Sequence, residues 1–139
     1  MKVLVLGKAT AASEAGEFAT PDEFVAMEQY SEQLAQSGIV LAGGGLQPSS
    51  KGKRVAIDAE GTARVIDGPF AETKELVAGY SIWEVASMDE AVEWLKRAPF
   101  RDSVVELRKI LDLDDFGDFA AEITAAEERS RAETAAAQS

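Results

Sequence analysis

Apolar residues recur at helical spacing in two stretches of the chain. The first stretch carries four of them: Phe24, Met27, Tyr30 and Leu34. Residues three and four apart share one face of a helix, so this stretch predicts an amphipathic helix. Thr20-Pro21-Asp22-Glu23 is a capping box that would start it, and Gly38 suits its end. Ser87-Met88-Asp89-Glu90 is a second capping box, and it precedes a second apolar stripe that ends at Leu95.

Short runs rich in apolar and β-branched residues predict six strands. They are Lys2–Gly7, Ile39–Ala42, Arg54–Asp58, Thr62–Ile66, Val77–Ala86 and Ser103–Leu111. Lys8–Ala19 is small and polar, so we expect a loop there, and Gly43–Gly45 would follow the second strand. The order of elements predicts an α+β fold: a ferredoxin-like antiparallel sheet with two helices on one face and an inserted β-hairpin.

Two helices cover only one face of such a sheet, while strand residues alternate between both faces. In the last strand Val105 and Leu107 fall on one side, and Glu106 and Arg108 fall on the other. A homodimer that packs sheet against sheet would cover the second face. Such a dimer would leave a cleft lined by groups such as Glu106 and Arg108.

The composition narrows the function classes. The net charge of −11 over 139 residues argues against nucleic acid and anionic membranes as partners. The chain has no cysteine and no histidine, so thiolate chemistry and the most common general base are absent. No apolar run reaches the roughly 20 residues of a membrane span, and no signal peptide is recognisable. We expect a cytoplasmic protein with neither a metal nor a cofactor.

Turn-forming and charged residues are concentrated in one loop, Asp67-Gly68-Pro69-Phe70-Ala71-Glu72-Thr73-Lys74-Glu75. A carboxylate at the mouth of a cleft can take up a proton, so Asp67 is the leading candidate for an acid–base residue. Asp before Gly is also a frequent turn residue, and Asp67 could simply hold the turn. Lys74 could bind an anionic group, or it could be a solvated lysine between Glu72 and Glu75.

Three strand residues are further candidates for ligand binding. Arg108 lies among Val and Leu residues, so its guanidinium must be paired or face a cleft. Either it recognises a carboxylate, or it forms a structural ion pair with Glu106. Tyr80 could offer its hydroxyl to a ligand, or its ring could belong to the core. The glycines Gly43–Gly45 lack the lysine and helix start of a phosphate-binding loop, and they favour close backbone packing instead.

Several segments together resemble the DGPF-motif group of the YCII-related family. The segments are Ala42-Gly43-Gly44-Gly45-Leu46-Gln47-Pro48, Asp67–Glu75, Gly79-Tyr80-Ser81-Ile82-Trp83-Glu84-Val85 and Val105-Glu106-Leu107-Arg108. The resemblance covers about residues 1–111 and implies a dimeric α/β-barrel. It also implies a link, for some members, with extracytoplasmic-function sigma factors. Some relatives use a histidine–aspartate pair for acid–base chemistry, and this chain has no histidine for such a pair.

Residues 112–139 form a second region, rich in Ala and Glu. It carries eight acidic and two basic side chains, a net charge of −6. We expect a helical extension, disordered in part, that could bind a protein partner.

Two functions stay open. The first is binding of a small anionic molecule in a dimer cleft, with cofactor-free proton-transfer, isomerase or lyase-type chemistry. The second is a non-catalytic interaction or regulatory module. The sequence decides neither whether the protein is an enzyme nor which ligand it takes.

Overall fold

Four antiparallel strands form the central sheet in the order β2-β5-β1-β6 in the computed structural model, which describes residues 1–139. The strands are β1 (Lys2–Lys8), β2 (Val40–Gly45), β5 (Val77–Glu84) and β6 (Val105–Lys109). The first strand of the chain lies between the last two, as in a ferredoxin-like fold. The α+β prediction is therefore confirmed.

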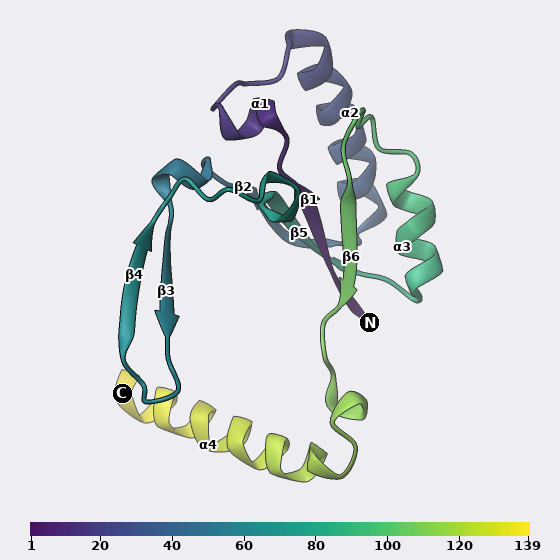
Figure 1. Cartoon of the computed structure of the whole chain (residues 1–139). Helices are drawn as coiled ribbons and strands as arrows, with labels where there is room; N and C mark the ends of the chain where they lie inside the picture. Colours follow the sequence, from purple (N-terminus) through teal and green to yellow (C-terminus); the bar gives the residue numbers. More distant parts are fainter.

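Helices α2 (Pro21–Ser37) and α3 (Met88–Leu95) cover one face of this sheet (Figure 1). The predicted caps fix where they start. The Thr20 hydroxyl accepts from the Glu23 amide at 3.3 Å, and the Ser87 hydroxyl accepts from the Glu90 amide at 3.1 Å. Gly38 ends α2 in the left-handed conformation, with φ of 77°.

The core lies between this face and the two helices. Its eight buried residues are Val3, Val5, Tyr30, Leu34, Ile39, Trp83, Val85 and Ala91. The Tyr30 hydroxyl donates to the Trp94 carbonyl at 2.7 Å and so joins α2 to α3. Burial raises the pKa of Tyr30 to about 12. The core is small, and α2 contributes only Tyr30 and Leu34 to it.

Two local predictions were wrong. The segment predicted as a loop contains a short helix, α1 (Ala11–Glu14), in which the Thr10 and Ser13 side chains cap each other's backbone amides. The second strand does not end before the glycines, because Gly43, Gly44 and Gly45 all pair with β5. Glycine disfavours a strand by itself, so this pairing depends on the neighbouring strand rather than on local preference.

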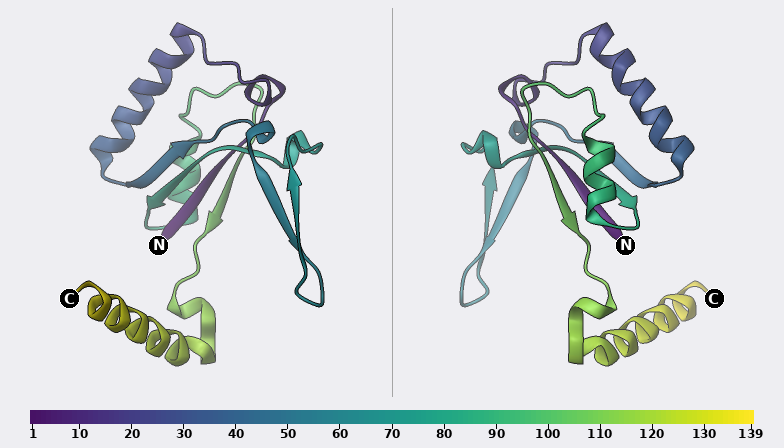
Figure 2. Two further views of the ribbon diagram at one scale, coloured as in Figure 1. Left: turned by 90° about the vertical axis from the view of Figure 1, so that its left-hand side faces the viewer. Right: turned by 90° about the vertical axis from the view of Figure 1, so that its right-hand side faces the viewer.

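The hairpin of β3 (Lys53–Ile57) and β4 (Ala63–Asp67) forms a separate two-stranded sheet. It projects away from the central sheet on the side opposite α2 (Figure 2). Two single 3₁₀ turns, η1 (Ser49–Lys51) and η2 (Thr73–Glu75), lie at its base. Val55, Ile57 and Val65 on this hairpin are exposed.

The C-terminal extension consists of η3 (Leu113–Phe119) and α4 (Ala120–Gln138). Lys109 fixes the turn after β6 through ion pairs with Asp112 at 3.1 Å and Asp115 at 2.7 Å. No residue of α4 is buried, and the helix lies apart from the rest of the domain (Figure 2). None of the helices is both long enough and apolar enough to cross a membrane.

Candidate functional site

A large cleft lies between α2 and the central sheet and has a volume of about 870 Å³. It exists because α2 packs onto the sheet only through its second half, at Tyr30 and Leu34. Residues from β1, α1, α2, β2, β5 and the loop before β6 line it. Its size falls within the range of pockets that hold small ligands.

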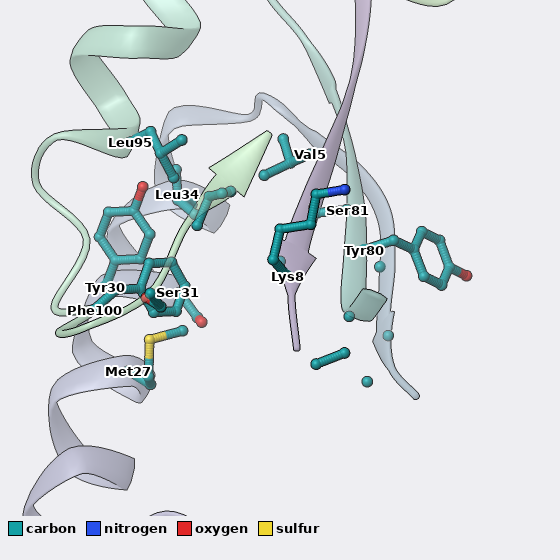
Figure 3. A pocket seen from close by; sticks show the side chains of 18 of the residues that line it. Val5, Lys8, Met27, Tyr30, Ser31, Leu34, Tyr80, Ser81, Leu95 and Phe100 are labelled. Carbon is teal, nitrogen blue, oxygen red and sulfur yellow. The ribbon is translucent and has the colours of Figure 1, made fainter. Parts of the chain in front are cut away.

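One wall of the cleft is apolar and aromatic. Met27, Tyr30 and Leu34 come from α2, Leu95 comes from α3, and Phe100 comes from the loop that follows α3. Figure 3 shows these side chains together on one side of the cleft. This wall could pack against the apolar part of a ligand.

The opposite side of the cleft is the sheet itself, and three glycines cross it in one row. Cross-strand pairing places Gly45 of β2 opposite Gly79 of β5, and Gly79 opposite Gly7 of β1. These three residues, here called the glycine row, all line the cleft. A Cβ atom added to Gly45 would have no atom within 4 Å, so the space above it is open.

Below the glycine row, towards the core, the side chains become larger. The next cross-strand row is Gly43, Ser81 and Val5, and the row after it is Val40, Trp83 and Val3. Trp83 is 2% exposed, yet its indole N–H has no hydrogen-bond acceptor. It is the sole buried side-chain donor or acceptor without a partner.

The charged residues of the lining are Lys8, Arg101 and Glu23. The Arg101 guanidinium donates to the Phe100 carbonyl at 2.7 Å, and this contact holds it at the rim of the cleft. Lys8 is 16% exposed and lies 3.4 Å from the Glu106 carboxylate. Glu23, the one carboxylate, accepts from the Thr20 amide at 3.0 Å and caps α2.

Asp67, the predicted acid–base residue, does not line the cleft. It closes β4 at the base of the hairpin, its side chain is 72% exposed, and it pairs with Lys53 on β3 at 2.5 Å. Lys74 is exposed in η2 and also lies outside the lining. The structure therefore does not bring the two charged candidates of this loop to the cleft.

The rest of the DGPF segment anchors the loop to the domain. The Phe70 amide donates to the Ser49 hydroxyl at 3.1 Å, and the Ser49 amide donates to the Glu14 carboxylate at 2.9 Å. The Ser49 hydroxyl also hydrogen-bonds to Glu14, and this lowers the pKa of that carboxyl group. A Cβ atom on Gly68 would overlap the Ser49 carbonyl oxygen, so only glycine fits there. We call Glu14, Ser49, Gly68 and Phe70 the loop anchor.

Arg108 and Glu106 lie on the open face of the sheet, opposite the helices. The Arg108 guanidinium donates to Glu106 at 3.3 Å and remains 71% exposed. Hydrogen bonding from Arg108, followed by the charge of Lys8, lowers the pKa of Glu106. Tyr80 contributes to the lining at the edge of the cleft, but Figure 3 shows its ring pointing away from Tyr30 and Phe100. Among the predicted site residues, Tyr80 alone belongs to the lining, and its ring lies on the open face of the sheet.

Sequence reasoning missed the cleft because its lining residues look ordinary one by one. Gly7, Gly45 and Gly79 are far apart in the chain, and only the pairing of strands places them in a row. Gly7 and Gly45 each end an apolar run. This is the one sequence signal that could have suggested that the two glycines lie at the same end of the sheet. No three carboxylate side chains gather in a metal-binding arrangement.

The model of the YCII-related domain matches residues 1–114. The chain therefore belongs to the YCII-related family. No curated protein matches it. Among solved structures it is similar to the 5-chloro-2-hydroxyhydroquinone dehydrochlorinase TftG from Burkholderia phenoliruptrix AC1100, in complex with 2,5-dihydroxybenzoquinone. The two chains are 20% identical over 81% of this chain and 96% of that chain, with a TM-score of 0.39.

Proposed function

We propose that this protein binds a small, mostly apolar molecule with one anionic group in the cleft between α2 and the sheet. The observation that carries this proposal is the cleft of about 870 Å³, in which an apolar wall faces a strip of sheet without side chains. Such a space would be filled by side chains in a purely structural core. The proposal concerns binding and assigns no reaction.

The charge of the lining supports an anionic ligand. The chain carries a net charge of −11, yet the cleft has two cations, Lys8 and Arg101, and one carboxylate, Glu23. That carboxylate already caps α2. Lys8 is already paired with Glu106, so Arg101, which pairs with no carboxylate, is the group proposed to attract and hold the anion.

Proton-transfer chemistry would need a base beside the ligand. Asp67 and Lys74 lie outside the cleft lining, so the proposal gives them no contact with the ligand. The proposal gives Glu106 and Arg108 no contact with the ligand either, because they pair with Lys8 and with each other on the open face of the sheet.

The binding proposal is tested by titrating the protein with 2-naphthoate, which combines a planar apolar body with a carboxylate. We expect saturable binding, and Arg101→Met should weaken it about tenfold through loss of a charge-assisted hydrogen bond. Arg64→Met is the matched control, because Arg64 is an exposed arginine of the hairpin strand β4 outside the cleft. If 2-naphthoate and its carboxamide bind equally well, the anionic part of the proposal is wrong.

We also propose a homodimer that pairs the open faces of two sheets. Leu4, Leu6, Ile82 and Tyr80 lie on this face, and none of them belongs to the core. An apolar sheet face of this kind is typical of an interface. Sedimentation at micromolar concentration should give twice the 14.8 kDa mass of one chain, and a mass of one chain would exclude the dimer.

A second candidate function, interaction with a regulatory protein, is favoured by the C-terminal extension. Phe119 is 69% exposed, and α4 buries no residue against the domain. The proposed partner could belong to a sigma-factor system, as the family resemblance implies. Removal of residues 118–139 should abolish partner binding without lowering the melting temperature. Unchanged partner binding would exclude this role.

A further inference from the structure

We propose that the ligand of this cleft is a planar, two-ring aromatic anion that lies on the glycine row and accepts a hydrogen bond from the Trp83 indole. This inference rests on the proposed function and names its ligand class. Two independent observations carry it: a side-chain-free strip of sheet and a buried donor without an acceptor, both in the lining of one cleft.

The glycine row provides a flat surface. Gly45, Gly79 and Gly7 lie side by side on three neighbouring strands, and strands are about 4.8 Å apart, so the strip is about 10 Å wide. No Cβ atom rises from it. A Cβ atom added at Gly45 would meet nothing within 4 Å, whereas one added at Gly79 would lie 3.3 Å from the Gly44 carbonyl oxygen of the same sheet. A planar ring can lie directly against peptide groups there, whereas a puckered ring would make fewer contacts.

The wall opposite this strip is suited to the second face of a ring. The side chains of Met27, Tyr30 and Phe100 come from α2 and from the loop before β6, and Figure 3 shows them grouped together. Aromatic and thioether groups pack well against aromatic rings. A planar ligand would therefore be held between backbone on one side and aromatic side chains on the other.

The length of the ligand follows from the positions of the polar groups. Arg101 lies in the loop before β6, and this loop meets the sheet at the glycine end of the cleft, because the Val104 carbonyl accepts from the Lys8 amide and Val105 pairs with Gly7. Trp83 lies four residues along β5 from Gly79, which is about 13 Å at about 3.3 Å per residue. Two fused rings with a polar group at each end, together with the hydrogen bonds that those groups make, span a distance of this order. The anionic group would meet Arg101, and an oxygen acceptor at the far end would meet the Trp83 N–H.

The test compares four probes on isotopically labelled full-length protein: 6-hydroxy-2-naphthoate, 2-naphthoate, 2-naphthamide and the non-planar decahydro-2-naphthoate. The chain has two tryptophans, so its spectrum has two indole N–H signals, and Trp94 serves as the internal control because it lies outside the cleft lining. We expect 6-hydroxy-2-naphthoate to move the Trp83 signal downfield and leave the Trp94 signal in place. The decahydro compound should bind at least tenfold more weakly.

Substitution gives a second readout. Trp83→Phe keeps an aromatic ring and removes the donor, so it should weaken 6-hydroxy-2-naphthoate about threefold to tenfold, the usual effect of one hydrogen bond. It should leave 2-naphthoate, which lacks the far oxygen, unchanged. Trp94→Phe should change neither affinity.

The outcomes separate the two levels of the proposal. If none of the four probes binds, the proposed function itself fails. If the planar and non-planar acids bind equally well, or if binding leaves the Trp83 signal unmoved, the planar-ligand inference is wrong and cleft binding stands. The signals of the wild-type protein give this answer even if Trp83→Phe does not fold.

Discussion

The loop anchor and the glycine row both depend on glycine, but for opposite reasons. At Gly68 in the loop anchor, a Cβ atom would overlap the Ser49 carbonyl, whereas at Gly45 in the glycine row it would meet no atom within 4 Å. The polar groups of the anchor are paired, while the buried N–H of Trp83, a residue of the cleft lining, has no acceptor. A glycine in crowded surroundings serves the architecture, and a glycine beside empty space leaves room for another molecule.

The largest effect should come from Gly68→Ala in the loop anchor. The added methyl group overlaps backbone that cannot rotate away, so the chain must shift at Ser49. Overpacking of this severity should lower the free energy of unfolding by about 3 kcal/mol or more. A loss of that size corresponds to a fall in melting temperature of about 10 °C for a chain of this length.

Gly52→Ala is the matched control for this prediction. Gly52 lies in the same region, and its added Cβ would meet the Ser49 carbonyl oxygen at 3.4 Å, which is close to an ordinary contact. We expect a much smaller decrease in melting temperature than for Gly68→Ala. Equal melting temperatures for the two variants would show that the anchor is not packed as described.

The next effect separates binding from stability at Gly45. Gly45→Val places a branched side chain in the open space above the glycine row, and valine suits a strand. The melting temperature should stay the same or rise, while the affinity for 2-naphthoate should fall at least tenfold. Ala63→Val, on the exposed hairpin strand β4, is the control and should leave the affinity unchanged. Retained affinity in Gly45→Val would place the ligand elsewhere.

A smaller loss of stability is expected for Ser49→Ala. The Ser49 hydroxyl donates to Glu14 and accepts from the Phe70 amide, so both partners lose a hydrogen bond. We expect the free energy of unfolding to decrease by about 1–2 kcal/mol in urea titrations. Ser50→Ala removes the neighbouring hydroxyl, which makes no hydrogen bond, and it should be neutral.

The smallest expected effect is on the stability of the protein at acid pH. Hydrogen bonds from Ser49 lower the pKa of Glu14 from 4.5 in the folded protein, so folding favours the ionised carboxylate. The resulting stabilisation is complete well above pH 4.5 and is lost as the pH falls through the lowered folded-state pKa. At pH 7 the urea midpoint of the wild-type protein should be higher than that of Glu14→Gln. The difference between the two midpoints should become smaller at pH 3. A difference that does not depend on pH would contradict this explanation.

The helices and the order of strands could be predicted because their signals are local. Capping boxes at Thr20 and Ser87 and apolar stripes lie within a few residues of one another, and the structure has both helices where these signals occur. The four-residue helix α1 is too short to carry an apolar stripe. The pairing of Gly43–Gly45 depends on β5, and nothing local in β2 indicates it.

The site was harder to predict because it depends on contacts between distant parts of the chain. Asp67 has the chemistry of a base, but Lys53, fourteen residues away, pairs with it outside the cleft. Trp83 looks like any core tryptophan, and only the surroundings of its indole reveal that it lacks an acceptor. Residue type therefore directs attention to the charged residues of the DGPF segment, whereas geometry directs it to the glycines.

The most direct test of the account is a titration of the labelled protein with 2-naphthoate, followed through its glycine amide signals. The account predicts that the signals of the glycine row, Gly7, Gly45 and Gly79, move with a common binding curve. It predicts that the amide signals of Gly68, in the loop anchor, and of Gly52, beside it, do not move. Movement of Gly52 and Gly68 with a stationary glycine row would contradict the account and return the site to the DGPF loop.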